Sequence, residues 1–392
     1  MADAIPAPLR FGVAGLGRAF SVMLPTFTRH PAAKLIAAAD TRSEARKRFA
    51  DEFSATTYGS VAELCADPAV DAVYVATPHQ FHREHATLAA RAGKHLLIEK
   101  PMALTLKDCA DIVETARGSR VQVVVGHSHA FDAPVRHLRR LVESGAYGKV
   151  RMINALNYTD YLYRPRRPEE LDTSKGGGAV FNQAAHHVDV VRLIAGAPVT
   201  GVCAQTGSWD RSRPTEGAYA ALLTFENGVF ASLVYSGYGH FDSDEFEGWI
   251  GEMGQAKAAY GAQPRRTFKS AEDETAFKNA RNYGGAEFRA AAGEAAAHQH
   301  FGTLVVSCEL ADLRAAPNGV VIYQNGSARL EPLPPPKVPR GEVIDELYEA
   351  VVHGKAPFHD GRWGMATVEV LLAMLRSSRE GCDVALNPGE AP

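Results

Sequence analysis

Cysteine is scarce and scattered in this chain of 392 residues. The five cysteines never form a C-x-x-C pair; they are Cys65, Cys109, Cys203, Cys308 and Cys382. This spacing argues against a zinc knuckle and against a disulfide framework, and it predicts reduced thiols. No window approaches the ~18 uninterrupted apolar residues of a membrane span, and MADAIPAPLRFG lacks the basic stretch and apolar run of a secretion signal. We therefore expect a cytoplasmic protein without a membrane partner.

An excess of one charge is also absent. The chain has 42 Lys and Arg against 45 Asp and Glu, for a formal net charge of -3, and 46% of its residues are hydrophobic. These values are typical of an ordinary globular protein, and they give no sign of a surface for nucleic acid. We expect no nucleic-acid partner.

The length exceeds the size at which one hydrophobic core usually stops growing, so two domains are expected. Up to about residue 130, short apolar runs alternate with helix-like stretches; the runs are LRFGVAGLG, LIAAAD, AVYVATP, HLLIEKP and VQVVVGHSH. Buried strands that are each followed by a helix form a parallel sheet with helices on both faces. Residues 1–130 are therefore predicted to form such an α/β domain.

The pattern changes after KVRMINALNY. The segments GVCAQTGSW, YAALLTFENG and GVFASLVYSGYG look like strands, but a helix does not follow each of them, and ENG is a hairpin signal. Residues 131–340 are predicted to form an α+β domain on a large, mostly antiparallel open sheet. Its residues 240–300 have few periodic apolar positions and suit a long excursion or lid. Residues 341–392 are predicted to be helices that pack back on the body.

Glycines follow the first predicted strand in FGVAGLGRAF. Gly12, Gly15 and Gly17 allow a tight turn and a close approach of a pyrophosphate to the start of the next helix. The last glycine of the G-x-G-x-x-G pattern is replaced by Phe20, so the match alone does not separate a dinucleotide site from a plain strand–helix turn.

The next strand strengthens the dinucleotide interpretation, because it ends in an acid about twenty residues further on. Asp40 can hydrogen-bond the adenosine ribose, which favours NAD, although it could also cap the following helix. Arg42 could accept a ribose phosphate, so NADP is not excluded. Arg18 and Ala19, which start the helix after the glycines, are expected to contact the cofactor as well.

Histidines recur in TPHQFHREHA, where His79, His82 and His85 form H-x-x-H-x-x-H. No carboxylate or thiolate motif accompanies them, so we predict no metal site. We interpret this segment as a polar loop near the cofactor, with Thr77, Pro78 and His82 as contacts.

Two further strand ends carry polar residues. His127 and His129 follow VQVVVG, where parallel sheets place ligand-contacting side chains, and they are expected to line a pocket. Glu99 and Lys100 end HLLIEKP. A lysine at the buried edge of a sheet is costly unless it is paired, here with Glu99, or directed at a ligand, and we favour the ligand.

A second glycine-rich turn, in SKGGGAVFNQAAHHVDVVRLI, precedes an apolar helix. Asn182 and His186 are four residues apart and therefore share one face of that helix, whereas His187 points elsewhere.

Taken together, GVAGLGRA, ATPHQFHREHA, the E-K-P strand end, GGG before a histidine-bearing helix and DGRWGMATVEV resemble the glucose–fructose oxidoreductase / inositol dehydrogenase / rhizopine-catabolism (Gfo/Idh/MocA) family. The resemblance covers nearly the whole chain. It implies an amino-terminal Rossmann domain that binds NAD(P), with Glu99 and Lys100 beside the cofactor. It also implies a second domain whose open sheet covers the active site and supports a homodimer or homotetramer.

The resemblance also implies catalytic roles. Lys100 matches the family lysine that contacts substrate and nicotinamide, and His186 matches the general acid/base. Family members commonly have Asp where this chain has Asn182, which can orient a substrate hydroxyl but cannot accept its proton. The proton transfer is therefore assigned to His186 and Lys100.

Arginines suggest the substrate. YLYRPRRPEE contains Arg164, Arg166 and Arg167, and GAQPRRTFK contains Arg265 and Arg266. They either form a solvated surface or bind a carboxylated substrate in a two-pronged geometry, for which we assign Arg164 and Arg166.

Within the family, the second half resembles the bacterial phthalate cis-dihydrodiol dehydrogenases. We therefore expect oxidation of a cyclic vicinal diol, with cis-4,5-dihydroxy-4,5-dihydrophthalate as the leading substrate and 4,5-dihydroxyphthalate as its product. The alternatives are a sugar or inositol dehydrogenase of the same family and a non-catalytic dinucleotide-binding regulator.

Overall fold

The computed structural model describes residues 7–260, 267–290 and 295–387. Its contacts divide the chain into two compact units. The first unit comprises residues 1–127, 269–293 and 338–368, and the second comprises residues 128–268, 294–337 and 369–392. Among the described residues, no helix is both long and apolar enough to cross a membrane.

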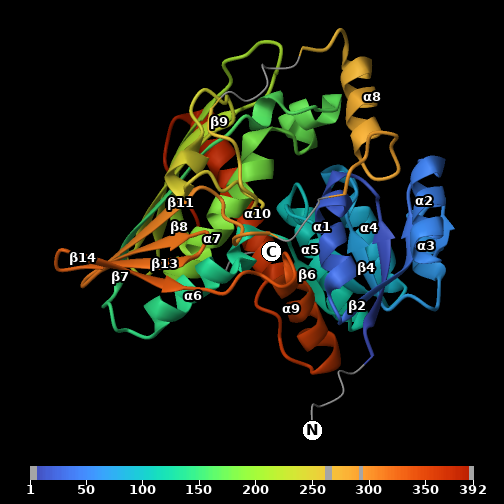
Figure 1. Cartoon of the computed structure of the whole chain (residues 1–392), viewed down its shortest axis with the longest axis horizontal. Helices are drawn as coiled ribbons and strands as arrows, with labels where there is room; N and C mark the ends of the chain where they lie inside the picture. Colours follow the sequence, from blue (N-terminus) through green and yellow to red (C-terminus); the bar gives the residue numbers. More distant parts are fainter. Residues whose placement is uncertain (1–6, 261–266, 291–294, 388–392) are drawn as a thin grey trace. The chain divides into compact units, whose positions relative to one another are not determined.

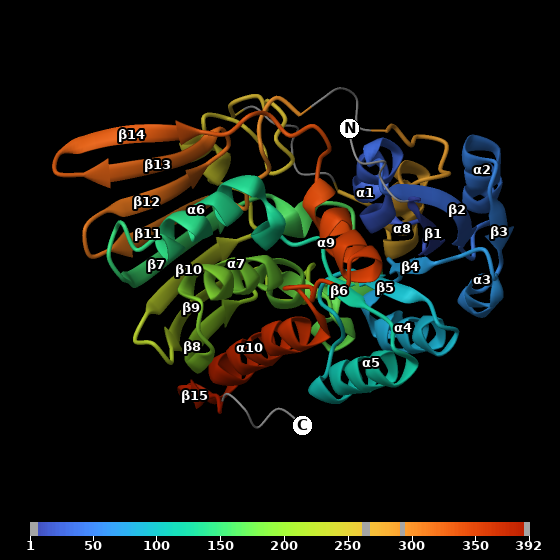
Figure 2. The same cartoon turned by 90° about the horizontal axis from the view of Figure 1, so that it is seen from below.

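The first unit is built on a six-stranded parallel sheet in the order β3-β2-β1-β4-β5-β6, of which Figure 1 labels β2, β4 and β6 and Figure 2 labels every strand. Its strands are β1 (Leu9–Ala14), β2 (Ala33–Ala39), β3 (Thr56–Tyr58), β4 (Ala72–Val75), β5 (His95–Ile98) and β6 (Val123–Val125). The connecting helices are α1 (Arg18–Arg29), α2 (Ser43–Phe53), α3 (Val61–Ala66), α4 (His82–Arg91) and α5 (Leu106–Ser119). The strand order reverses between β1 and β4, and ligands of such sheets bind at the carboxyl ends of the strands at this reversal.

Short apolar sequences form these strands because helices cover the sheet. Every residue of β4 is buried, and α4 and α5 lie side by side in Figure 2. Two later helices belong to the same unit, α8 (Ala271–Arg281) and α9 (Gly341–Val352).

The second unit is built on a nine-stranded sheet in the order β14-β13-β12-β11-β7-β10-β9-β8-β15. All neighbours are antiparallel except β7 and β10, which are parallel. The strands are β7 (Val150–Tyr158), β8 (Val199–Gly207), β9 (Ala218–Phe225), β10 (Phe230–Ser236), β11 (Thr303–Cys308), β12 (Asp312–Ala316), β13 (Gly319–Gln324), β14 (Ser327–Pro332) and β15 (Val384–Ala385). This confirms the predicted fold class, a parallel Rossmann sheet followed by a mostly antiparallel one.

Helices α6 (Ala133–Glu143) and α7 (Ala185–Ala195) pack on this second sheet (Figure 2). Helix α10 (Gly361–Glu380) contributes residues to both units. Side chains in β9 alternate between buried and exposed, so that Leu222 is 45% exposed, and Phe230 at the start of β10 is 42% exposed. The other face of the sheet therefore presents apolar side chains to solvent.

The excursion differs from its predicted place. We expected residues 240–300 to belong to the second domain, but residues 269–290 pack with the first unit. Tyr283 lies edge-on to Phe20 of α1 with ring centroids 5.0 Å apart, and also contacts Phe49 of α2. Gly284 has a φ of +83°, and a β-carbon there would lie 2.4 Å from the α-carbon of Ala45. Aromatic packing and close backbone approach therefore hold this segment to the first unit.

Candidate active site

The glycine turn after β1 shows two different requirements for glycine. Gly15 has a φ of +95°, and a β-carbon there would lie 2.9 Å from the carbonyl oxygen of Ala76. Gly17 precedes α1, and a β-carbon there would meet no other heavy atom within 4 Å. The first glycine thus makes the turn, and the second leaves open space at the helix amino terminus, where a pyrophosphate fits.

The departure at Phe20 also has a structural reason. Its ring is buried and packs against Phe49 and Tyr283. The position where the fingerprint has its last glycine therefore anchors the excursion segment in this chain. Arg18 and Ala19 lie in the first turn of α1, with Arg18 exposed.

Asp40 holds the glycine turn. Its carboxylate accepts hydrogen bonds from the backbone amides of Leu16, at 2.7 Å, and Arg42, at 2.8 Å. The Arg42 guanidinium in turn donates to the carbonyl oxygens of Leu16 and Tyr283 and pairs with Asp40 at 3.1 Å. Helix α2 begins at Ser43 with Arg42 as its N-cap, so the alternative that Asp40 caps this helix is wrong.

The predicted polar loop after β4 is tied to the loop after β5 by one ring. His82 is buried, with Nε2 2.8 Å from the carbonyl oxygen of Thr77 and Nδ1 3.0 Å from that of Pro101. Burial lowers its pKa to about 4. His85 contacts the hydroxyl of Thr77 instead, at 2.9 Å, and Pro78 is the N-cap of the intervening 3-10 turn. Among the described residues, no group of three or more His, Cys, Asp or Glu side chains could hold a metal ion.

The Glu99 side chain is buried inside the first unit. Its carboxylate accepts a short hydrogen bond from the buried Tyr74 hydroxyl. Burial raises the pKa of Glu99, against the opposing charges of Lys100 and Arg340. Glu99 thus has Tyr74 as a partner. Lys100 follows it at the carboxyl edge of the sheet and is partly exposed.

In the second glycine-rich turn, which belongs to the second unit, Asn182 binds the backbone of the turn, a role that the sequence did not indicate. Residues Val180–Ala184 form a π-helical turn before α7, so α-helical spacing does not apply between Asn182 and His186. The Asn182 amide donates to the carbonyl oxygens of Gly176, at 3.0 Å, and Gly178, at 2.9 Å. An aspartate could not make these two hydrogen bonds, because a carboxylate has no proton to donate.

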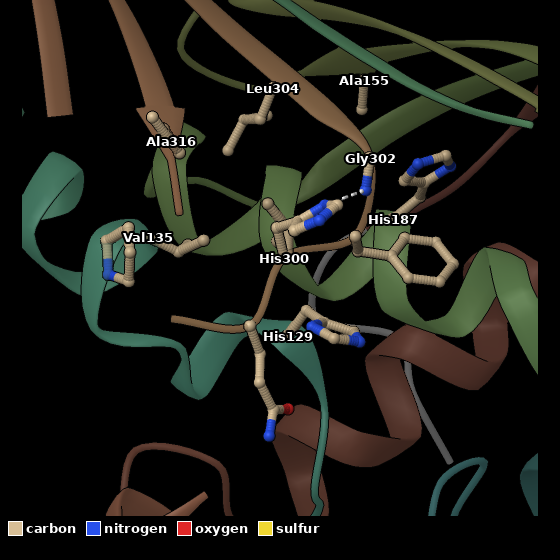
Figure 3. A pocket seen from close by; sticks show the side chains of 13 residues that line it. His129, Val135, Ala155, His187, His300, Gly302, Leu304 and Ala316 are labelled. Carbon is tan, nitrogen blue, oxygen red and sulfur yellow. Dashed lines mark hydrogen bonds between the residues drawn. The ribbon is translucent and has the colours of Figure 1, made fainter. Parts of the chain in front are cut away.

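His186 belongs to a buried group of aromatic rings. Its ring centroid lies 4.8 Å from that of His129 and 4.8 Å from that of Phe301. His187 faces a different partner, the hydroxyl of Tyr219, at 2.8 Å from Nδ1. Figure 3 shows His129, His187 and His300 around a cavity of about 20 Å³, enough for roughly one water molecule.

Two carboxylates that sequence reasoning missed hold His129. Asp132 Oδ2 lies 2.6 Å from His129 Nδ1, and Glu252 Oε1 lies 3.5 Å from Nε2. The spacing H-x-x-D in HAFD could have indicated Asp132, but no local signal marks Glu252. His127, which we expected to line the same pocket, is buried and belongs to the first unit.

The arginines of the 164–167 segment have different environments. Arg164 is 45% exposed, pairs with Asp160 at 2.8 Å and lines a hollow of about 270 Å³ together with Glu252. Arg166 is only 10% exposed, and its guanidinium lies 3.8 Å above the ring of Tyr161.

The other arginines of the two sequence motifs are Arg167, Arg265 and Arg266. Arg167 pairs with Glu169 and Glu170. Arg265 and Arg266 lie outside the described residues.

Comparison with known proteins gives consistent relatives for both units. The domain described as "Oxidoreductase family, NAD-binding Rossmann fold" matches residues 9–127, and the "GFO/IDH/MocA C-terminal domain" matches residues 135–254. The 1-carboxy-3-chloro-3,4-dihydroxycyclohexa-1,5-diene dehydrogenase of Comamonas testosteroni is 45% identical over 95% of each chain. The 1,5-anhydro-D-fructose reductase of Ensifer adhaerens is 33% identical over 44% of this chain and 53% of its own.

A solved structure from Bordetella bronchiseptica RB50, described as a dehydrogenase, has 42% sequence identity and a TM-score of 0.90. The match covers 97% of this chain and all of that one (100%). The chain is therefore an enzyme of the Gfo/Idh/MocA oxidoreductase family, with an NAD-binding Rossmann domain.

Proposed function

We propose that this enzyme oxidises a carboxylated cyclic vicinal diol with NAD+, with cis-4,5-dihydroxy-4,5-dihydrophthalate as the leading candidate and 4,5-dihydroxyphthalate as its product. The observation that carries the proposal is the 45% identity, over 95% of each chain, to a dehydrogenase whose named substrate is a chlorinated ring with one carboxyl and two adjacent hydroxyl groups. In the proposed dihydrophthalate diol, loss of a hydride from one carbinol carbon and of the proton from its hydroxyl gives a ketone, and the hydrogen on the neighbouring carbinol carbon lets this ketone tautomerise to the aromatic product. Aromaticity then favours the oxidative direction.

The first unit supplies the groups that would hold the cofactor. The open space at Gly17 suits the pyrophosphate, and Asp40 lies at the end of β2, where it can reach the adenosine ribose. A ribose phosphate would meet the Asp40 carboxylate and an Arg42 guanidinium that already has three partners. This favours NAD over NADP. When bound, the nicotinamide supplies the hydride acceptor.

The proton is assigned to His186 and Lys100. A hydride can leave the carbinol carbon only as the hydroxyl proton is removed, and a ring nitrogen of His186 or the Lys100 amine can hold that proton. The Asn182 amide cannot, and its two protons already bind Gly176 and Gly178. Asn182 thus shapes the glycine turn ahead of the histidine-bearing helix.

The ring carboxylate is assigned to Arg164 rather than to Arg166. Arg164 is exposed and lines the hollow, so a substrate carboxylate can reach its guanidinium there, whereas Lys257 in the same lining already pairs with Asp242 and Asp244. Arg166 already stacks on Tyr161 and donates to its carbonyl oxygen at 2.6 Å, so a substrate would have to displace it.

A substrate panel tests the proposal. Purified enzyme is incubated with NAD+ and, separately, with carboxylated cis-dihydrodiols, neutral cis-dihydrodiols, myo-inositol and 1,5-anhydro sugars, and NADH formation is followed by fluorescence. We expect the highest kcat/KM with a carboxylated dihydrodiol. Preference for a sugar or inositol would refute the proposal and favour the reaction type of the fructose reductase relative. NAD binding without turnover of any compound would favour a regulator.

Self-association is also part of the proposal. The outer face of the nine-stranded sheet exposes Leu222 and Phe230, and uncovered apolar faces of this kind commonly mark protein interfaces. We expect a homodimer or homotetramer formed through this face. Sedimentation of the enzyme should give a multiple of the 42.2 kDa chain mass, and Leu222→Lys should lower it.

The state of the cysteines agrees with a cytoplasmic location. All five lie among the described residues, and each is unbridged. Cys65 and Cys109 are buried, and burial raises the pKa of both thiols. Such thiols are stable in a reducing compartment.

A further inference from the structure

The second unit contains a row of alternately acidic and basic side chains that passes beside His186. Asp132 and His129 are 2.6 Å apart, His129 and Glu252 are 3.5 Å apart, and Glu252 and Arg164 are 4.0 Å apart. Asp160 completes the row at 2.8 Å from Arg164. The side chains of His129 and Asp132 are 1% and 4% exposed, whereas Arg164 is 45% exposed. The row thus runs from the buried histidines to the hollow that we assign to the substrate carboxylate.

The surroundings of His129 favour a charged ring. Burial by itself disfavours the charge, but the charges and hydrogen bonds of Asp132 and Glu252 outweigh burial and raise its pKa. Among the described residues, three histidines also lie near it: His186 and His187 of α7, and His300 on the wall of the shared cavity. The two carboxylates approach opposite ring nitrogens: Asp132 lies at hydrogen-bond distance from Nδ1, and Glu252 lies at ion-pair distance from Nε2.

The charge on His129 lies next to the proposed base. His129 and His186 pack edge to face, and the ring of Phe301 covers both of them. Two positive charges at this separation, in a buried and weakly screened site, repel each other strongly. The neighbouring His187 already shows the effect, because burial and then the His129 charge lower its pKa to about 3.

We propose that Asp132 and Glu252 hold His129 as a buried imidazolium, and that this cation keeps the adjacent His186 in its neutral, proton-accepting form. His129 is then a positioning residue that acts through His186. The functional half of this inference rests on the proposed role of His186, whereas the protonation of His129 does not.

Nitrogen-15 NMR of the histidine rings tests the first half on wild-type enzyme without cofactor or substrate. Signals are assigned by single His→Gln substitutions. We expect two ring protons on His129 at pH 7 and one on His186. A neutral His129 at pH 7 would overturn the inference whatever the enzyme is found to catalyse.

Three substitutions test the second half through the pH dependence of kcat/KM. His129→Gln removes the cation and leaves both carboxylates, so the acidic limb should move to higher pH by at least about one unit. That is a roughly tenfold loss of kcat/KM at a pH on the limb. Asp132→Asn should give a smaller shift in the same direction. Glu252→Gln should shift the acidic limb least. The Glu252 side chain is 31% exposed, so the fold should tolerate this substitution.

The matched control is Glu331→Gln, which breaks another histidine–carboxylate pair of the second unit. His137 and Glu331 are 3.0 Å apart, and neither belongs to the row of charges. We expect an unchanged pH profile. An acidic limb that stays at its wild-type pH in both His129→Gln and Glu252→Gln would overturn the inference. If no compound of the panel is oxidised, the proposed function fails, and the NMR titration of His186 in the same variants still decides whether His129 controls its protonation.

Discussion

The two glycines of the first turn allow a prediction that separates folding from cofactor binding. At Gly15 the φ of +95° is unfavourable for any residue with a β-carbon, which costs on the order of 1–3 kcal/mol. The added carbon would also lie 2.9 Å from a backbone oxygen, which must shift. Gly15→Ala should therefore lower the Tm of the cofactor-free enzyme by several degrees, at about 2–4 °C per kcal/mol for a domain of this size.

Gly17→Ala should behave in the opposite way. The φ of Gly17 is −82°, which any residue adopts, and the new methyl group would meet nothing within 4 Å. Stability should change by less than about 1 kcal/mol, the usual size of an N-cap effect. The methyl group would fill the space over the helix terminus that we assign to the pyrophosphate. We expect NAD+ to bind at least roughly tenfold more weakly, which corresponds to ~1.4 kcal/mol.

Thermal unfolding and calorimetric titration with NAD+ measure the two quantities on the same samples. Gly15→Ala should lose stability, and Gly17→Ala should lose affinity for NAD+. Wild-type affinity in Gly17→Ala would show that the pyrophosphate does not approach this residue. Wild-type stability in Gly15→Ala would show that the turn relaxes around the added carbon.

Three further predictions concern the second unit and the proton. Arg164→Leu should raise KM for a carboxylated diol far more than for a neutral diol. Equal effects of this variant on both KM values would refute the carboxylate assignment. Arg166→Leu should instead lower Tm, because the stacking of Arg166 on Tyr161 is lost. His186→Ala and Lys100→Ala should each lower kcat by roughly 10²–10⁴-fold with little change in NAD affinity. The loss of kcat in the double variant should be smaller than the product of the two single losses. Near wild-type kcat in both single variants would place the chemistry elsewhere. Asp132→Asn should destabilise the protein most near pH 6. The pKa of His129 is raised in the folded state, so its pairing stabilises the fold fully below the unfolded pKa of ~6.5 and less as the pH rises through the folded value. A stability difference that grows with pH in chemical denaturation would contradict this.

The sequence predicted those parts of the fold that depend on local patterns. Strands such as β4 are short, apolar and buried on both faces, so their period and length identify them directly. The place of residues 269–290 was not predictable in this way. What fixes them is Tyr283 against Phe20 and Phe49, and a single aromatic residue in a polar segment does not indicate which unit it will contact.

In the candidate site, too, only the residues that local motifs mark could be predicted from the sequence. The glycines, Lys100 and His186 lie in recognisable motifs, and the prediction that Asn182 cannot accept a proton follows from its chemistry. Its donation to two glycine carbonyl oxygens depends on a π-helical turn that residue spacing does not indicate. Glu252 was missed because its partner His129 lies far away along the chain, and a charged residue in a polar segment is ordinarily solvated.

The division of each unit among separate stretches of chain has a consequence for how the protein is made. The parallel sheet ends with β6 at Val125, so its strands all leave the ribosome early. Partners of that sheet and of its first helix come much later: the carbonyl of Pro339 accepts from the Thr26 hydroxyl in α1, and that of His359 accepts from the Val125 amide in β6. A nascent chain therefore holds an incomplete Rossmann unit, with apolar surface uncovered, until residues 338–368 have been synthesised. Truncation after residue 130 should yield an aggregation-prone fragment rather than an isolated NAD-binding domain.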